Sequence, residues 1–153
     1  CGITQLRPSS KGYVEIKSNN IYEPPIINPK YLDNDFDKET LINGVKLVRK
    51  IYSSKPLSDY CKEETIPGKQ ISTDDQIIDY ARKFGSTVYH PIGTCRMGND
   101  PNSVVDLDLK VRGIKNLRVI DASIMPEMVS GNTYAATNMI AEKGSDLILN
   151  SIN

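Results

Sequence analysis

The stretch Tyr89-His90-Pro91-Ile92-Gly93-Thr94-Cys95-Arg96-Met97-Gly98 holds the only histidine in a sequence of 153 residues. Histidine is the side chain whose ordinary pKa lets it accept or donate a proton near neutral pH. Pro91 restricts the backbone and the two glycines permit conformations closed to other residues, so the stretch is predicted to form an ordered loop. A loop of this kind can aim an imidazole, which makes His90 the first candidate for acid/base chemistry.

A helix is predicted well before this loop, with Asp35 or Asp37 as its N-cap. Its apolar side chains recur at steps of three and four residues and so form one face. They are Leu41, Ile42, Val45, Val48 and Ile51. The segment from Ser53 to Gln70 that follows is polar and contains two prolines, which favours a long surface loop.

A second helix leads into the His90 loop. It begins at Ser72 or Thr73, because both residues have the spacing of a capping box, to Asp75 and to Gln76 respectively. Gly85 is expected to end it. Its buried side is expected to contain Ile77, Ile78, Ala81 and Phe84.

Short extended segments are predicted after the loop. Val104-Val105 and Leu109-Lys110-Val111 are expected to pair, and Leu117-Arg118-Val119-Ile120 to form a buried strand. Asp121-Ala122-Ser123 follows at the carboxyl end of that strand, the edge at which ligands bind in α/β sheets. An aspartate with small neighbours there suits hydroxyl and phosphate groups, although Asp121 could equally close a turn.

A last helix is predicted to start at Asn132 or Thr133, either of which is a good cap. The amino terminus of a helix offers unpaired amide donors and a partial positive charge, which favour an electron-rich ligand. Together with Asp121, this helix start predicts half of a cofactor site. The core side of the helix is expected to contain Ala135, Ala136, Met139, Ile140, Leu147 and Ile148.

The amino-terminal third is expected to be extended. Residues 12–17 alternate apolar and polar side chains, which indicates a half-buried strand, most simply in a hairpin. Pro24, Pro25 and Pro29 restrict the next segment to loop or sheet edge, because proline lacks a backbone donor. The predicted fold class is therefore α+β, an antiparallel sheet with packed helices.

Composition argues against several classes of function. The 19 basic and 19 acidic residues cancel, which disfavours nucleic acid or an anionic membrane as a partner. The hydrophobic share of 39% and the charged share of 25% are typical of a soluble globular protein. No metal site is predicted, because no second histidine or paired cysteine accompanies His90 and Cys95. Three scattered cysteines favour a reducing compartment.

Four motifs resemble the carboxy-terminal region of the glucose-methanol-choline (GMC) oxidoreductases, most closely the choline dehydrogenase-like branch. They are residues 90–98, 117–126, 130–133 and 139–143. The resemblance implies FAD-dependent oxidation of a small-molecule alcohol, in which His90 takes the hydroxyl proton while hydride passes to flavin N5. It also implies that Asn132 hydrogen-bonds the substrate oxygen. Asp121 and Ala122 would approach the ribityl and pyrophosphate portion, and Asn132 and Thr133 the isoalloxazine ring, Thr133 through its backbone.

The resemblance also divides the chain. Residues 1–115 would be the substrate-domain portion that contains the His90 loop, and residues 116–153 the return strand and helix that complete the FAD-binding domain. The sequence begins at Cys1 and contains no Gly-x-Gly turn for a pyrophosphate. It is therefore expected to be a fragment that lacks FAD and turnover without the missing amino-terminal FAD domain. An unpaired strand edge is expected to favour self-association, and the parent is expected to be cytoplasmic or peripheral to the inner membrane.

Two other functions remain open on the same sequence. A hydroxynitrile lyase on this scaffold would also use the histidine as base. A noncatalytic cap or interaction module would instead associate with a chain that supplies the nucleotide domain. Plain structural roles also compete, since a lone histidine is often only a hydrogen-bonded structural residue and Asn132 only a helix cap.

Overall fold

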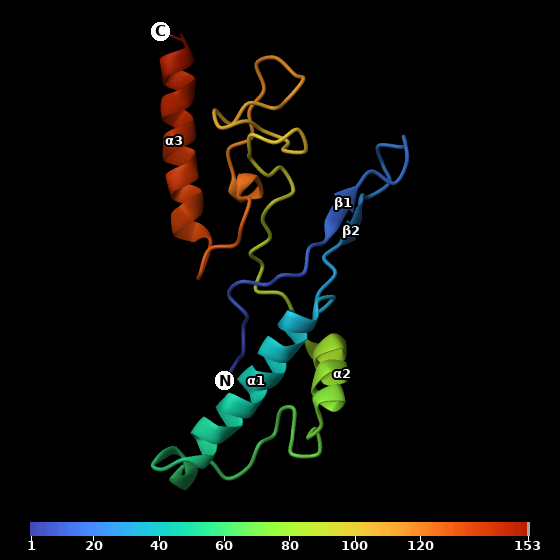
Figure 1. Ribbon diagram of the computed structural model, residues 1–153, viewed down its shortest axis with the longest axis vertical. Coiled ribbons are helices and arrows are strands. Elements are labelled where there is room, and N and C mark those ends of the chain that lie inside the picture. The colour runs from blue at the N-terminus through green and yellow to red at the C-terminus, as the bar shows by residue number, and fades with distance from the viewer. Residues whose placement is uncertain (153) are drawn as a thin grey trace. The chain divides into compact units, whose positions relative to one another are not determined.

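The computed structural model describes residues 1–152 and divides into two compact units, Cys1–Val88 and the part that starts at Tyr89. Figure 1 shows the helices and strands of each unit. The predicted division at residues 115 and 116 concerns the domains of a longer enzyme and stays a prediction. The elements confirm the α+β class, with three α-helices and a two-stranded antiparallel sheet in the described residues.

The sheet belongs to the first unit. Strand β1 (Tyr13–Glu15) pairs with β2 (Ile26–Asn28), with Tyr13 opposite Asn28 and Glu15 opposite Ile26. The predicted strand in residues 12–17 is confirmed, but its three residues are all exposed, so the predicted half-burial is wrong. Its partner comes from the proline-containing segment, which is compatible with an edge strand because neither strand needs donors on its outer side.

The N-cap of helix α1 (Asp35–Ser53) lies one residue before the first of its two predicted caps. The side chain of Asn34 accepts a hydrogen bond from the amide of Phe36, so Asn34 is the N-cap and the predicted caps Asp35 and Asp37 are wrong. Asn34 has the extended backbone that an N-cap requires, whereas Asp35 and Asp37 are already helical. Asp37 has another role, because only 1% of its surface is exposed.

The carboxylate of Asp37 ties the amino-terminal segment to α1. It accepts hydrogen bonds from the Gln5 side chain at 2.8 Å, from the Ser9 amide at 2.8 Å and from the Ser10 amide at 2.7 Å. The Ser10 hydroxyl donates as well. Burial raises the pKa of Asp37, but these hydrogen bonds outweigh burial and the net pKa is lowered.

Helix α2 (Asp74–Phe84) follows the sequence signals closely. Of the two predicted capping boxes, the one between Thr73 and Gln76 is formed, and the amide of Gly85 closes the helix on the Ala81 carbonyl at 2.7 Å. Ile77 and Ile78 are buried, but Phe84, predicted to be buried, is 61% exposed. It occupies the last helical position, where the helix ends before another element covers the ring.

The segment between α1 and α2 contains one short 3₁₀ helix, η1 (Leu57–Asp59). Arg49 holds the later part of this segment to α1. Its guanidinium donates two hydrogen bonds to Glu64, at 2.8 and 2.7 Å, and one to the Ile71 carbonyl at 2.7 Å. A bidentate pair of this kind is both directional and strong. The Glu64 side chain is thus a structural partner of the helix.

The second unit has a contiguous apolar core and little regular sheet. The buried residues of this apolar core are Val105, Leu109, Ile124, Met125 and Ile140. The predicted pairing of 104–105 with 109–111 is confirmed as an antiparallel bridge between Val105 and Val111.

The strand predicted over residues 117–120 is wrong as a regular strand, since this segment makes only an isolated bridge between Lys110 and Arg118. It has a neighbour on one side, through bonds between the Val111 amide and the Leu117 carbonyl and between the Val119 amide and the Leu109 carbonyl. Within residues 1–152 no second strand continues the ladder.

Helix α3 (Tyr134–Ile152) packs on this core with one narrow face. Ile140 is buried, and Ala136 and Leu147 pack beside it. Gly144 lets the helix approach Ile120, because a Cβ at Gly144 would lie 2.3 Å from the Ile120 side chain.

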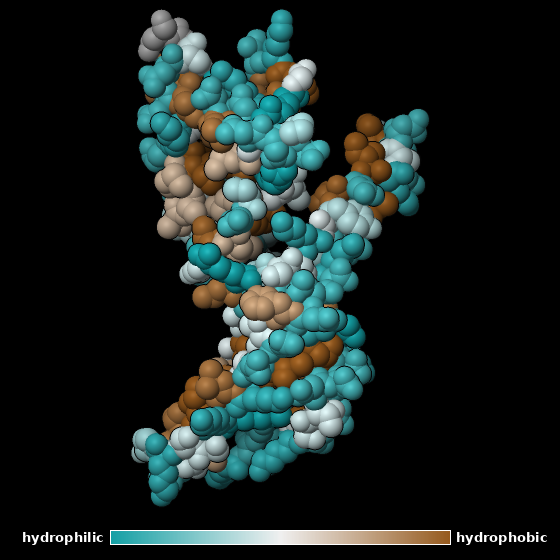
Figure 2. All heavy atoms as spheres, in the orientation of Figure 1, coloured by the Kyte–Doolittle hydropathy of each residue, from teal (hydrophilic) through white to brown (hydrophobic). Residues whose placement is uncertain are grey.

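Three further residues predicted to lie in the core of α3 are exposed. They are Ala135, Met139 and Ile148. Helical periodicity marks an apolar face without showing what covers it. Hydrophobic residues also reach the surface of the first unit (Figure 2); on α1 they are Phe36, Leu47, Ile51 and Tyr52. Among the described helices none is long and apolar enough to cross a bilayer.

Candidate active site

The loop that carries His90 contains two residues with an unusual backbone conformation. Tyr89 has a positive φ of 61° and Gly93 one of 84°. Such values are costly for a side chain such as that of Tyr89 and favour glycine at the second position. The loop is then joined to a 3₁₀ turn, η2 (Ala122–Ile124), by two backbone bonds. The Cys95 amide donates to the Ser123 carbonyl at 3.0 Å and the Met97 amide to the Ile124 carbonyl at 2.8 Å.

Apolar side chains of the loop also pack against the core of the second unit. Ile92 and Met97 of the loop, Ala122 of η2 and Ala136 of α3 all pack against the buried core. Three segments that are distant in sequence therefore share one set of apolar contacts. Close packing of this kind resists rearrangement, because a displaced side chain would leave a void.

Charged side chains stiffen the exit of the loop. Arg96 donates two hydrogen bonds of 2.8 Å to Asp100, and this guanidinium lowers the pKa of Asp100 to about 2. Arg112 donates to the hydroxyl of buried Ser103 at 2.9 Å and to the Gly98 carbonyl at 2.7 Å. The residues after His90 therefore form an ordered turn, as the sequence predicts.

The His90 ring meets the residue that precedes α3. Its Nδ1 lies 3.1 Å from the Thr133 hydroxyl oxygen, a hydrogen-bonding distance. Thr133 is buried, with 8% of its surface exposed, and His90 is half-buried. The structure describes no hydrogen bond at the other ring nitrogen, Nε2. One ring nitrogen of His90 is thus held by the protein, and the other has no hydrogen-bond partner among the described residues.

Asn132 is the neighbour of Thr133 in the chain and is exposed. Within residues 1–152 its side-chain amide makes no hydrogen bond. His90 and the 132–133 segment, which the sequence assigns to one site, are therefore brought together, with the side-chain contact made by Thr133. The predicted roles of Asn132 toward a substrate or cofactor stay predictions.

Asp121 closes a turn. It is the N-cap of η2, and one carboxylate oxygen accepts the Ser123 amide at 2.7 Å. Its residue is exposed, and the second carboxylate oxygen makes no hydrogen bond to the described residues. Ala122 is half-buried against the core. The structural alternative for Asp121, a residue that closes a turn, is therefore confirmed, and its predicted role toward a cofactor stays a prediction.

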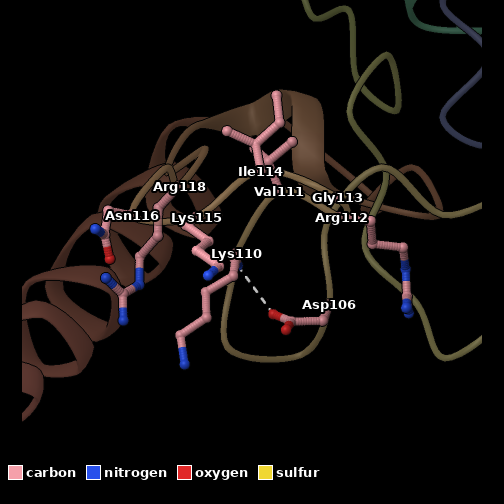
Figure 3. Close-up of a pocket in the computed structure, with 9 residues that line it drawn as sticks. All are labelled: Asp106, Lys110, Val111, Arg112, Gly113, Ile114, Lys115, Asn116 and Arg118. Atoms are coloured by element: carbon pink, nitrogen blue, oxygen red, sulfur yellow. Dashed lines mark hydrogen bonds between the residues drawn. The ribbon is translucent and has the colours of Figure 1, made fainter.

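Two surface cavities lie away from these residues. The first, of about 520 Å³, belongs to the second unit and is lined by Lys110, Arg112, Lys115, Arg118 and Asp106, with four further residues (Figure 3). Lys110, Lys115 and Arg118 extend toward the same side of it. None of the predicted site residues lines either cavity. The described residues also contain no group of three or more histidine, cysteine or acidic side chains arranged to hold a metal.

Two features of this region were absent from the sequence prediction. The hydroxyl of Thr133 contacts His90, a residue 43 positions earlier in the sequence, and Arg112 braces the loop exit through Ser103. A threonine just before a helix predicts a cap, and nothing local indicates a histidine partner. The opposite charges of Arg96 and Asp100, four residues apart, are a local signal that could have indicated a rigid loop exit.

Comparison with known proteins gives a consistent result. Residues 8–141 match the family model described as GMC oxidoreductase. An alcohol dehydrogenase [acceptor] of Pseudomonas putida is 45% identical over 151 residues, which are 99% of this chain and 27% of that protein. Human mitochondrial choline dehydrogenase is 43% identical over 94% of this chain and 24% of its own length.

The structural comparison agrees. An FAD-dependent oxidoreductase from Chaetomium thermophilum superposes with a TM-score of 0.86 at 28% identity, and covers 95% of this chain and 26% of that one. The chain thus spans about a quarter of the length of the proteins it matches.

Proposed function

Since the chain belongs to the GMC oxidoreductase family, we propose that it forms the carboxy-terminal part of an FAD-dependent enzyme that oxidises an alcohol. That longer polypeptide is called the parent enzyme below. In it, His90 is the base that accepts the hydroxyl proton of the substrate. The alcohol and choline dehydrogenases among its relatives support this reaction class.

One observation carries the proposal. His90 Nδ1 is hydrogen-bonded by Thr133, and Nε2 has no partner within the described residues. A general base needs a lone pair that no protein group occupies, and Nε2 offers one when the ring proton lies on Nδ1. A positioned base contributes about 10² to 10⁴ in rate. The exposed amide of Asn132, next to Thr133, would donate to the substrate oxygen as negative charge develops there.

The groups near η2 and α3 fit the FAD that the family implies. The free carboxylate oxygen of Asp121 suits a ribityl hydroxyl, and the first amides of α3 suit the electron-rich edge of a flavin ring. When bound, FAD supplies the acceptor for the hydride. This chain would hold the ring side of the cofactor, with Ala122, Asn132 and Thr133 as its other contacts and residues 116–153 completing the FAD domain.

The rest of the parent enzyme supplies what this chain lacks. The sequence has ten glycines but no Gly-x-Gly turn to bind a pyrophosphate. Several apolar side chains, including Tyr134 and Met139 on α3, are more than 60% exposed and would be covered by the missing three quarters. The 153-residue chain by itself is accordingly expected to retain no FAD and to show no turnover.

The reaction class is tested on the purified parent enzyme with choline and with primary aliphatic and aromatic alcohols. We expect alcohol-dependent reduction of a redox dye by a yellow, FAD-containing protein. Release of cyanide from an aromatic cyanohydrin without flavin reduction would instead identify a lyase. A parent without FAD and with neither activity would identify an interaction module.

A further inference from the structure

In the hydrogen bond between His90 and Thr133, one group donates the proton and the other accepts it, and the roles decide which ring nitrogen can act as a base. A neutral imidazole carries one proton, on Nδ1 or on Nε2, and the other nitrogen holds the lone pair. A threonine hydroxyl both donates and accepts, so the 3.1 Å distance is compatible with either tautomer. If the hydroxyl donates to Nδ1, the proton lies on Nε2 and the free nitrogen cannot act as a base. If Nδ1–H donates to the hydroxyl, the lone pair lies on Nε2.

We infer that Thr133 is a positioning residue that accepts a hydrogen bond from Nδ1–H and thereby holds His90 in the tautomer whose Nε2 is the base. This inference rests on the proposed role of His90 and goes beyond it, because it assigns a task to the Thr133 side chain. The acceptor role serves both stages of the reaction. Once Nε2 has taken the substrate proton, the imidazolium still carries Nδ1–H, and the same hydrogen bond persists.

Thr133 is itself held firmly enough to orient a ring. Its carbonyl accepts from the Thr137 amide at 2.9 Å and from the Thr137 hydroxyl at 2.8 Å, at the first turn of α3. Its side chain is buried, with 8% of the residue exposed. The position of its hydroxyl is therefore set by the helix start, which is anchored in the core through Ala136 and Ile140. The start of α3 thus determines how the imidazole faces its ligand.

The alternative is a passive contact in which the hydroxyl only fills space beside the ring. The two cases differ in measurable ways. A passive contact leaves the tautomer of His90 to its intrinsic preference, which for an unconstrained histidine favours the proton on Nε2. A positioning contact reverses that preference, and the reversal requires the hydroxyl but not the methyl group of Thr133.

The test uses the FAD-loaded parent enzyme and three variants. Thr133→Val removes the hydroxyl at nearly constant shape, Thr133→Ser retains it, and His90→Gln identifies the His90 signals by their loss. Nitrogen-15 spectra of histidine-labelled protein report the tautomer, and anaerobic rapid mixing with alcohol reports the rate of flavin reduction. We expect Nδ1–H in the wild type and in Thr133→Ser. In Thr133→Val we expect a shift toward Nε2–H and reduction about three- to tenfold slower, with KM nearly unchanged, as for one lost hydrogen bond.

Three results would overturn the inference. They are an Nε2–H tautomer in the wild type, a Thr133→Val variant equal to wild type in both readouts, and a Thr133→Ser variant as slow as Thr133→Val. If Thr133→Val loses its flavin, the wild-type and Thr133→Ser spectra still decide. A His90→Gln enzyme with full rate would refute the proposed base itself. A slow His90→Gln enzyme beside an unaffected Thr133→Val would refute only the positioning role.

Discussion

The two compact units are stabilised by different means. In the first unit, few of the described side chains are buried. They include Ile77, Ile78 and Asp37. Hydrogen bonds to Asp37 and the Arg49–Glu64 pair hold its segments to α1. In the second unit, a contiguous apolar core lies under the His90 loop, η2 and α3. The candidate site therefore rests on the unit whose packing is least tolerant of displacement.

This difference has a functional sense. A base and its partners must be held to within a fraction of an ångström, and apolar packing with backbone hydrogen bonds does so independently of pH. Charged hydrogen bonds are directional but depend on the protonation state of their members. The stability of the first unit should consequently depend on pH in the acid range, and that of the second unit on the volume of its core side chains.

The largest effect is expected from a cavity under the site. Ile124 is 1% exposed and its carbonyl accepts the Met97 amide. Ile124→Ala should destabilise the second unit by about 2 to 5 kcal/mol, through lost burial and an unfilled void. In the parent enzyme, hydrogen exchange of the peptides that contain residues 92–98 should become at least about 30-fold faster.

The matched control for this cavity is Ile114→Ala, because Ile114 belongs to the same unit but is not part of the apolar core under the loop. In Ile114→Ala, hydrogen exchange of the peptides that contain residues 92–98 should stay close to that of the wild type. Equal effects of the two substitutions would mean that the core does not support the His90 loop.

A smaller, pH-dependent effect is expected at Asp37. Asp37→Asn replaces an acceptor by a group that also presents N–H, so some donors from residues 5–10 lose their partner. The cost should be about 1 to 3 kcal/mol near neutral pH. It would appear as faster hydrogen exchange in residues 5–10 and at the start of α1, after correction for the intrinsic exchange rate.

The pH dependence of that effect follows from the lowered pKa of Asp37. A carboxyl whose pKa is depressed by folding stabilises the protein above its unfolded value of about 3.9, and this contribution is lost as the pH falls through the folded value. The difference between wild type and Asp37→Asn should therefore shrink below about pH 4. Asp33→Asn, at an exposed position of the same unit, should show no such difference. A difference independent of pH would contradict the role of the Asp37 charge.

Local sequence signals were sufficient for part of the fold. Helix α2 was predicted at both ends, because Thr73, Gln76 and Gly85 act on their immediate neighbours. The N-cap of α1 was misjudged, because three acceptors, Asn34, Asp35 and Asp37, lie within four positions. The long-range donors from residues 5–10, which give Asp37 its place, are invisible in the local pattern.

The remaining errors concern partners. The apolar residues of the segment 117–120 predict a buried strand, but a regular strand needs a continuous ladder with its neighbour, and here the pairing is limited to the isolated Lys110–Arg118 bridge. Met139 fits the apolar face of α3, yet it is 62% exposed within the described chain.

At the candidate site, the resemblance named the residues His90, Asn132 and Thr133 individually. The structure added that Nδ1 of His90 is held by the Thr133 hydroxyl. A contact over 43 positions depends on tertiary packing, and no spacing rule contains it.

The central claim is that His90 takes the hydroxyl proton of an alcohol while the flavin of the parent enzyme is reduced. Its most direct test is anaerobic rapid-mixing reduction of that flavin by an alcohol substrate in the wild type and in His90→Gln, whose side chain keeps polar contacts but cannot accept the proton. The account predicts that His90→Gln retains its flavin and is reduced at least about 100-fold more slowly. A flavin-loaded variant reduced at the wild-type rate would contradict it.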